Sequence, residues 1–249
     1  MNQNQLIFLS SQPRSGSTLT QRILSVNSQI YTRSEPWLML DAPFNSQRLY
    51  RYSEFNELLA KKGIGSFIDE LPEGRKTYIE KLQQFYLNLY GHYIEQSKQT
   101  LFLDKTPRYY HIIEELYETF PQARFILLIR HPLSVLGSIL STWIKGNQWY
   151  QLANFKHDLF TAIKTNIQEI ATNRENTFIL YYEKLIQNPQ DEVQNICSFL
   201  GIDFEKKMLE YFNHNKEKWV YGDPENIYKK KYVDANNDTK WQKRLNEPQ

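Results

Sequence analysis

The chain has a single cysteine, Cys197, among its 249 residues, so no disulfide can form within it. No apolar run approaches the roughly 20 residues that a membrane-spanning helix needs. Met1–Gln5 carries no Lys or Arg, and the apolar run Leu6–Leu9 is too short for the hydrophobic region of a signal peptide. These absences predict a protein of the cytoplasm, where thiols stay reduced. Cys197 lies among the apolar residues of an expected helix over 189–200, which predicts a core residue rather than a nucleophile.

Neither the charge nor the histidines point to a polyanionic partner or a metal. The formal net charge is only +2, which gives no reason to expect nucleic acid or an anionic membrane surface as a partner. The five histidines show no metal-ligand spacing such as His-x-x-x-His, and we expect no metal site. No internal repeat or low-complexity segment is present.

Short apolar runs alternate with longer amphipathic segments. The helices expected include residues 76–97 and 155–174, the second with Leu159, Ile163, Ile167 and Ile170 on one side. This alternation predicts a single α/β domain over residues 1–249, with a parallel sheet of about five strands and helices on both faces. Residues 1–212 would form the core and 213–249 a polar, basic tail. The expected strands are Leu6–Ser10, Ile30–Thr32, Thr100–Asp104, Arg124–Arg130 and Thr177–Tyr182.

A loop rich in serine follows the first expected strand and leads into a helix, with the sequence Ser10-Ser-Gln-Pro-Arg-Ser-Gly-Ser-Thr-Leu19. Free backbone N–H groups and the positive end of the helix dipole meet at such a junction, which suits a phosphate group. Arg14 adds a permanent positive charge. The loop is not a Walker A motif, because Ser17 follows Gly16 where that motif has lysine. The plain structural alternative is a tight turn in which serine caps the helix.

Further polar residues follow the other expected strands. Lys105 follows one strand, Arg130-His131-Pro132 follows the apolar run 125–129, and Tyr182-Glu183 ends the last strand. The carboxyl ends of parallel strands form the usual ligand-binding edge of such a sheet, so these residues are expected to meet there.

Together these segments resemble the sulfotransferases that use 3′-phosphoadenosine 5′-phosphosulfate (PAPS), over roughly residues 6–200. Four pieces occur in the family's order. Pro13–Leu19 is similar to the family's loop for the 5′-phosphosulfate, and Asp104–Pro107 to its strand-end lysine segment. Arg130–Pro132 with Ser138 is similar to the 3′-phosphate motif. Tyr182–Leu185 with Asn188-Pro189 is similar to the family's Tyr-Glu-Asp-Leu…Asn-Pro segment. The resemblance implies a P-loop NTPase-like fold.

The resemblance also implies the site residues. Lys105 would be catalytic, stabilising charge on the bridging oxygen as the S–O bond breaks. The nucleotide would be bound by Arg14, Ser15, Gly16, Ser17, Thr18, Leu19, Arg130, Ser138 and Tyr182, with Lys229 or Lys230 of the tail as further candidates.

One departure from the family concerns the catalytic base. Cytosolic sulfotransferases acting on phenols and steroids have Lys-Thr-His, whose His is the base, whereas this chain has Pro107 there. Tyrosylprotein sulfotransferases and many bacterial relatives use a Glu about twenty residues past the phosphate-loop Arg, and Glu35 lies at that distance. Glu35 is therefore the expected general base, with His111 as a rival.

The implied function is transfer of a sulfuryl group from PAPS to a hydroxyl or amine of a small molecule, with release of 3′-phosphoadenosine 5′-phosphate (PAP) and without a metal. Residues 41–52 and 62–74 are expected to be surface insertions able to cover the acceptor. Two alternatives are a P-loop-like nucleotide kinase and a nucleotide-binding protein without catalysis. The acceptor and the oligomeric state are not predicted. Aromatic residues that would wall the acceptor pocket, or else simply belong to the core, are Trp37, Trp143, Trp149 and Tyr150.

Overall fold

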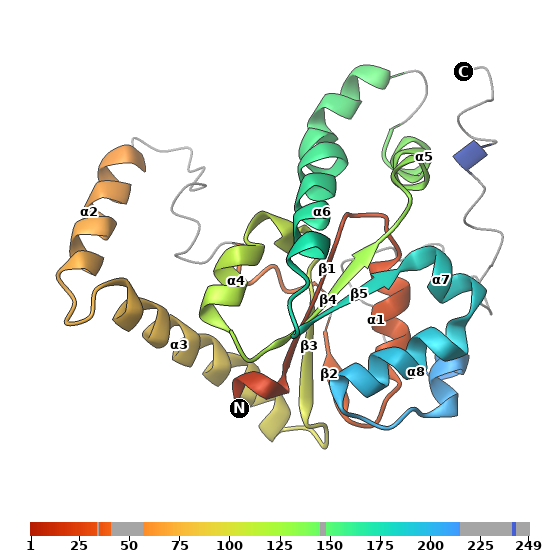
Figure 1. Ribbon diagram of the computed structural model, residues 1–249, viewed down its shortest axis with the longest axis horizontal. Helices are drawn as coiled ribbons and strands as arrows, with labels where there is room; N and C mark the ends of the chain where they lie inside the picture. The colour runs from red at the N-terminus through yellow and green to blue at the C-terminus, as the bar shows by residue number, and fades with distance from the viewer. Residues whose placement is uncertain (34, 41–56, 145–147, 215–240, 243–249) are drawn as a thin grey trace.

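The computed structural model describes residues 1–33, 35–40, 57–144, 148–214 and 241–242. At its centre is a five-stranded sheet in the order β2-β3-β1-β4-β5, with every neighbouring pair parallel (Figure 1). The predicted α/β class is thus confirmed. The strands are β1 (Leu6–Ser11), β2 (Ile30–Thr32), β3 (Leu101–Lys105), β4 (Arg124–Ile129) and β5 (Thr177–Tyr181).

Helices connect the strands and cover the sheet on both sides (Figure 1). The α-helices are α1 (Ser17–Ser25), α2 (Glu57–Asp69), α3 (Arg75–Glu95), α4 (Ile113–Thr119), α5 (Pro132–Thr142), α6 (Ala162–Thr172), α7 (Tyr182–Gln187), α8 (Pro189–Leu200) and α9 (Tyr211–His214). Short 3₁₀ helices are η1 (Gln3–Gln5), η3 (Pro107–His111), η4 (Trp149–Phe155) and η6 (Lys206–Glu210), and η5 (His157–Thr161) is a π-helical turn.

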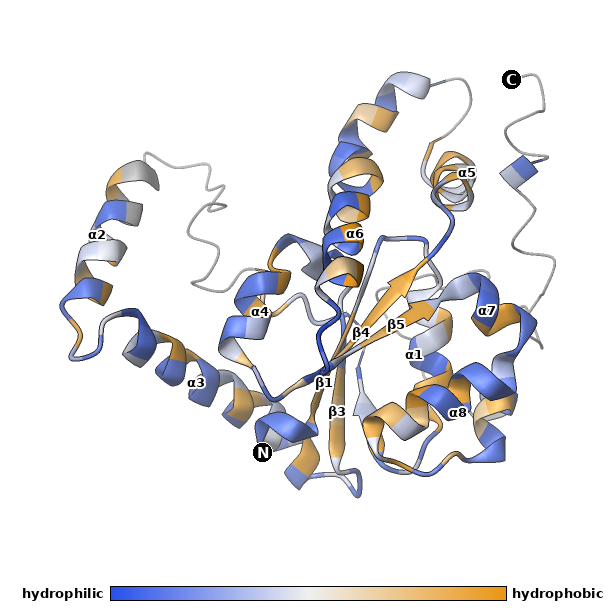
Figure 2. Cartoon of the chain, in the orientation of Figure 1, coloured by the Kyte–Doolittle hydropathy of each residue, from blue (hydrophilic) through white to orange (hydrophobic). Residues whose placement is uncertain are grey.

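The pleat of β1 explains the two layers of core. Successive side chains of a strand point to opposite faces. Ile7 and Leu9 therefore pack with residues of α1 and α8, whereas Leu6 and Phe8 pack with residues of α3 and α4. Because both faces are covered, the central strands are mostly apolar up to their carboxyl ends, as their hydropathy colouring shows (Figure 2).

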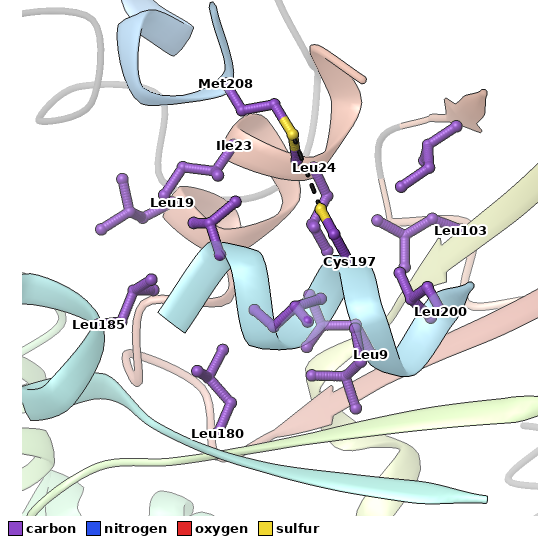
Figure 3. Packing of buried hydrophobic residues seen from close by; sticks show 14 of the residues in the cluster. Leu9, Leu19, Ile23, Leu24, Leu103, Leu180, Leu185, Cys197, Leu200 and Met208 are labelled. Carbon is purple, nitrogen blue, oxygen red and sulfur yellow. Dashed lines mark hydrogen bonds between the residues drawn. The ribbon is translucent and has the colours of Figure 1, made fainter. Parts of the chain in front are cut away.

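Cys197 lies inside the first of these layers (Figure 3). It is buried on α8, and its Sγ lies 3.9 Å from Sδ of Met208. Burial raises the pKa of the Cys197 thiol to about 11. A thiol that stays protonated is a poor nucleophile, which confirms the predicted core role.

The segment predicted as one helix over 155–174 differs from the prediction. It consists of the last residue of η4, the π turn η5 and α6, and two of the isoleucines placed on one side of the expected helix are exposed. Ile167 is 61% exposed and Ile170 39%, whereas Asp158, Asn166 and Glu169 are buried. The polar side turns inward because partners for it are fixed there: Asp158 meets Arg108, and Glu169 lies 3.5 Å from Arg174.

Two smaller differences concern segment ends. β5 stops at Tyr181, and Tyr182 is the first residue of α7 rather than the end of a strand. Residues 62–74, predicted as a surface insertion, contain the end of α2 and a turn before α3. The other expected insertion, 41–52, lies outside the described residues.

Candidate active site

The loop between β1 and α1 has a shape that only particular residues allow. Gly16, the N-cap of α1, has φ +96°, and a Cβ there would overlap the ring of Tyr182. Glycine is required on both counts. Arg14 also adopts a left-handed conformation, with φ +69°. Such strain in a non-glycine residue tends to occur at functional sites.

The start of α1 offers donors for an anion. The first N–H groups of any α-helix lack intrahelical acceptors, and no side chain caps α1. Ser15 Oγ is buried and has no hydrogen-bond partner among the described residues. A polar atom buried in this way usually has a partner that the structure does not include. The backbone amides, the helix dipole and the unsatisfied Ser15 hydroxyl together suit a phosphate.

Arginines from two segments meet beside this loop. Arg14 donates from Nε to Ser138 Oγ and from Nη2 to Thr142 Oγ1, both at 3.2 Å. Arg130 donates from Nη1 to the carbonyl oxygen of Arg14 at 2.8 Å, and its Cζ lies 4.4 Å from the ring centroid of Tyr182. Four residues predicted to bind nucleotide, from four segments, thus form one cluster.

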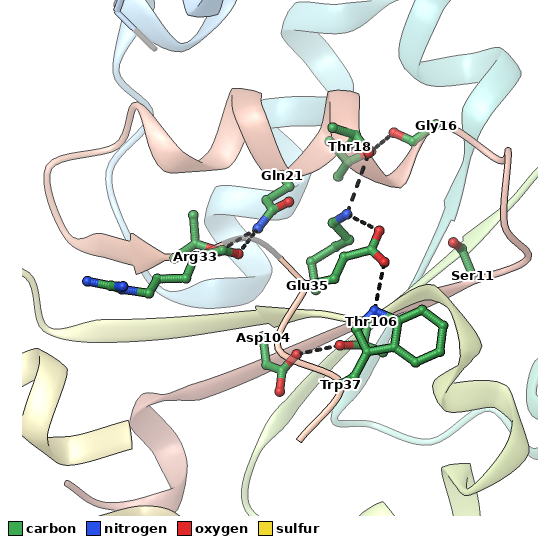
Figure 4. A network of polar contacts seen from close by, with 12 residues as sticks. Ser11, Gly16, Thr18, Gln21, Arg33, Glu35, Trp37, Asp104 and Thr106 are labelled. Atoms are coloured by element: carbon green, nitrogen blue, oxygen red, sulfur yellow. Dashed lines mark hydrogen bonds and ion pairs between the residues drawn. The ribbon is translucent and has the colours of Figure 1, made fainter. Parts of the chain in front are cut away.

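Lys105 and Glu35 form a second cluster at the same edge of the sheet, and Figure 4 shows Glu35 among its polar neighbours. Lys105 is the last residue of β3, and its Nζ lies 2.6 Å from Glu35 Oε1. The same Nζ lies 3.5 Å from Oγ1 of Thr18, on the phosphate loop side. The Lys105 side chain is fully buried, and this burial lowers its pKa although Glu35 acts in the opposite direction. An ammonium and a carboxylate are therefore held together next to the anion-binding loop.

Trp37 fixes the orientation of Glu35. Its Nε1 donates to Glu35 Oε2 at 3.1 Å, so each carboxylate oxygen has a different partner. Trp37 has φ +55°, a further left-handed conformation at this site.

Asp104, which sequence reasoning did not single out, anchors the strand end below Lys105. It is completely buried and accepts hydrogen bonds from Tyr90 (2.5 Å), Tyr109 (2.8 Å) and Thr106 (3.0 Å). Burial raises its pKa to about 6, against the effect of those hydrogen bonds. A carboxylate within an otherwise apolar strand was the signal that could have identified it.

The rival base His111 is placed differently. Pro107 begins η3 and His111 ends it. The His111 ring lies 4.2 Å from the Tyr110 ring and 5.8 Å from the His157 ring, between centroids. Glu35 is thus the candidate base that contacts Lys105 directly.

The predicted acceptor-wall residues separate into two groups. Trp37 and Trp143 lie at the site, since Arg14 Cζ is 5.6 Å from the Trp143 ring centroid. Trp149 and Tyr150 lie on η4 and are exposed. Lys229 and Lys230 are outside the described residues. Trp241, which is described, stacks on His131 at 5.1 Å.

The described part of the chain contains neither a candidate membrane span nor a candidate metal-binding cluster. None of its helices combines the length and apolarity needed to span a bilayer. Within the same residues, no group of three or more His, Cys, Asp or Glu is arranged to hold a metal ion.

Comparison with known proteins gives consistent matches. The family model described as "Sulfotransferase family" matches residues 6–206. The nodulation protein NoeE of Sinorhizobium fredii is 27% identical over 218 residues, 80% of this chain but only 50% of NoeE, so the chain spans about half the length of that relative. A putative protein-tyrosine sulfotransferase of Caenorhabditis briggsae is 25% identical, over 84% of this chain and 70% of its own length.

A solved structure extends this likeness to the fold. The sulfotransferase domain of the Synechococcus PCC 7002 olefin synthase superposes with a TM-score of 0.66 at 26% identity. The match covers 95% of this chain and 86% of that one.

Proposed function

Because the chain belongs to the sulfotransferase family, we propose that it transfers a sulfuryl group from PAPS to a hydroxyl or amine of a small molecule and releases PAP. The observation that carries this proposal is the Lys105–Glu35 pair, 2.6 Å apart and adjacent to the phosphate loop. A base and a cation placed together at a phosphate-binding loop are what such a transfer needs.

The proposed reaction is a direct displacement at sulfur. The acceptor oxygen attacks the sulfur atom, its proton passes to Glu35, and the bond from sulfur to the bridging oxygen breaks. That oxygen keeps the electron pair and leaves as part of PAP. Lys105, when protonated, stabilises the negative charge that grows there, an electrostatic role that is largest in the transition state. Glu35 acts as general base.

The nucleotide would lie across the two clusters. Ser15, the start of α1 and Arg14 suit its 5′ side, and Arg130 with Ser138 suits the 3′-phosphate. Arg130 is already oriented by the Arg14 carbonyl and by Tyr182. An arginine fixed in this way loses little side-chain freedom on binding. The 3′-phosphate contact would favour PAPS over ATP.

A small-molecule acceptor, in secondary metabolism, is part of the proposal. It is supported by the resemblance to a domain of an olefin synthase, while the relative named as a protein-tyrosine sulfotransferase keeps a tyrosine hydroxyl as the competing acceptor. The proposed base, Glu35, lies at the distance from Arg14 where the resemblance to the tyrosylprotein enzymes and bacterial relatives implies a Glu.

The test is PAP release from PAPS over a panel of alcohols, phenols, amines and a tyrosine peptide, with ATP as a parallel donor. We expect PAPS turnover with at least one small acceptor, loss of that turnover in Glu35→Gln, and no transfer from ATP. Transfer from ATP alone would favour the kinase alternative. PAP binding without turnover of PAPS on any acceptor would favour the non-catalytic one.

A further inference from the structure

Arg108 lies near the proposed base, and one of its three guanidinium nitrogens makes no hydrogen bond to a described residue. It follows Lys105 by three residues, within η3. Its Nε donates to Asp158 Oδ1 at 3.0 Å and its Nη2 to Oδ2 at 2.7 Å. Nη1 makes no hydrogen bond to any described residue, and the side chain is 29% exposed. The guanidinium is therefore fixed in orientation while still able to bind a ligand.

Asp158 provides that orientation. It lies in the π turn η5, is buried, and also accepts a hydrogen bond from Tyr110 at 2.6 Å. Its backbone carbonyl accepts from Nε2 of Gln12 at 2.8 Å, so one residue connects the phosphate loop to the segment after Lys105. Single π turns occur frequently at functional sites.

Two tryptophans place Arg108 relative to the reaction site. Its Cζ is 5.5 Å from the ring centroid of Trp37, whose Nε1 donates to Glu35. The same Cζ is 6.0 Å from the centroid of Trp143, the ring that Arg14 also approaches. The guanidinium thus lies near two indoles, one tied to the proposed base and one to the phosphate loop.

The charges of the site indicate what Arg108 would recognise. Lys105 is neutralised by Glu35, and a bound nucleotide would add several negative charges to the side of Arg14 and Arg130. An anionic acceptor would be repelled by both Glu35 and the nucleotide. It could approach the base only where a charged donor offsets this repulsion. Arg108 is paired with Asp158 through Nε and Nη2, but the N–H groups of its Nη1 remain as such donors beside Trp37. A neutral acceptor would need no charge there.

We propose that Arg108 selects acceptors that carry a carboxylate close to the hydroxyl to be sulfated, with Asp158 as its positioning residue. This proposal rests on the proposed function and names the acceptor class for the same site. The substrates would be hydroxy acids, with Trp37 and Trp143 in contact with their carbon skeleton. Charge-assisted hydrogen bonds provide the discrimination.

The test compares matched ligands that differ only in charge. The probes are 4-hydroxybenzoate with 4-hydroxybenzamide, and 3-hydroxybutyrate with 3-hydroxybutyramide, titrated calorimetrically into the PAP-loaded protein. We expect at least one carboxylate to bind about 10- to 150-fold more tightly than its amide. Arg108→Gln should abolish that preference and leave the Kd for PAP unchanged. Asp158→Asn should weaken the preference, because its charge is lost while Arg108 remains.

Arg75→Gln is the matched control, since Arg75 also forms two hydrogen bonds with one carboxylate, that of the exposed Glu118 on α4. This variant should keep the full preference. Equal binding of carboxylate and amide by the wild-type protein, or no binding of any carboxylate, would overturn the proposal, and neither result depends on a variant folding. If PAP binds and PAPS is turned over but amides are used as well as carboxylates, only the acceptor class is wrong. If PAP itself does not bind, the proposed function fails.

Discussion

Nζ of Lys105 and Oε1 of Glu35 lie 2.6 Å apart, although 70 positions separate the two residues in the sequence. In the absence of nucleotide each group is the counterion of the other. Both are almost completely buried, so removal of either leaves an uncompensated charge. The proposed base and the proposed stabiliser of the leaving group are therefore electrostatically coupled.

Replacement of Glu35 by Gln removes the base and keeps its size. We expect kcat to fall about 10²- to 10⁴-fold, because the acceptor proton has no acceptor group, while the Kd for PAP changes little. His111→Ala, assayed in parallel, should retain most activity. The opposite pattern, in which His111→Ala is inactive and Glu35→Gln is active, would move the base to η3.

The pH dependence of turnover should report Lys105. Burial lowers the pKa of Lys105 from its ordinary value of 10.5. The ammonium is present below that lowered pKa and is lost as pH rises through it, so kcat should begin to fall at a lower pH than for an exposed lysine. Lys105→Arg should move this alkaline decline to higher pH, because the guanidinium stays charged. The same decline in both proteins would assign it to another group.

The loop glycine offers a prediction with an internal control. Gly16→Ala adds a methyl group that overlaps the Tyr182 ring, at φ +96°. Overpacking and backbone strain together should lower the free energy of unfolding by roughly 2–5 kcal/mol and weaken PAP binding. Gly65→Ala, in α2 with no atom within 4 Å of the new Cβ, should raise it by roughly 0.5–1 kcal/mol. Urea unfolding measures both, and equal effects of the two substitutions would contradict the loop geometry.

Asp104 should give the protein a specific pH dependence of stability. Its pKa is about 6 in the fold and ordinarily 3.8, so between these values the folded state keeps a proton that the unfolded chain has released. Stability is therefore lost as pH rises through this window, by about 3 kcal/mol for a pKa difference of this size. Asp104→Asn should lack this decline. Parallel stability curves for the two proteins from about pH 4 to 7 would show that Asp104 is not perturbed in this way.

Much of the site follows from sequence, because a parallel sheet gathers the carboxyl ends of its strands at one edge. Arg14, Lys105 and Arg130 each follow an apolar run, and this was enough to predict that they share an edge. The Arg108–Asp158 contact could not be predicted in the same way. It depends on a π turn and on the polar side of residues 157–172 facing inward, whereas the isoleucine spacing there favours the opposite rotation. The spacing of apolar residues cannot predict which side of a helix is buried when the buried residues of that helix are polar or charged.

The proposed function depends most on the binding of a nucleotide 3′-phosphate by Arg130 and Ser138. PAP and AMP differ only in that group, so their dissociation constants, measured by calorimetry and checked by thermal shift, isolate it. We expect the wild-type protein to bind PAP about 10- to 150-fold more tightly than AMP. Arg130→Ala should reduce this ratio to within a few-fold, while Arg75→Ala should preserve it. Equal affinity for PAP and AMP in the wild-type protein, or an unchanged ratio in Arg130→Ala, would show that Arg130 does not bind a 3′-phosphate.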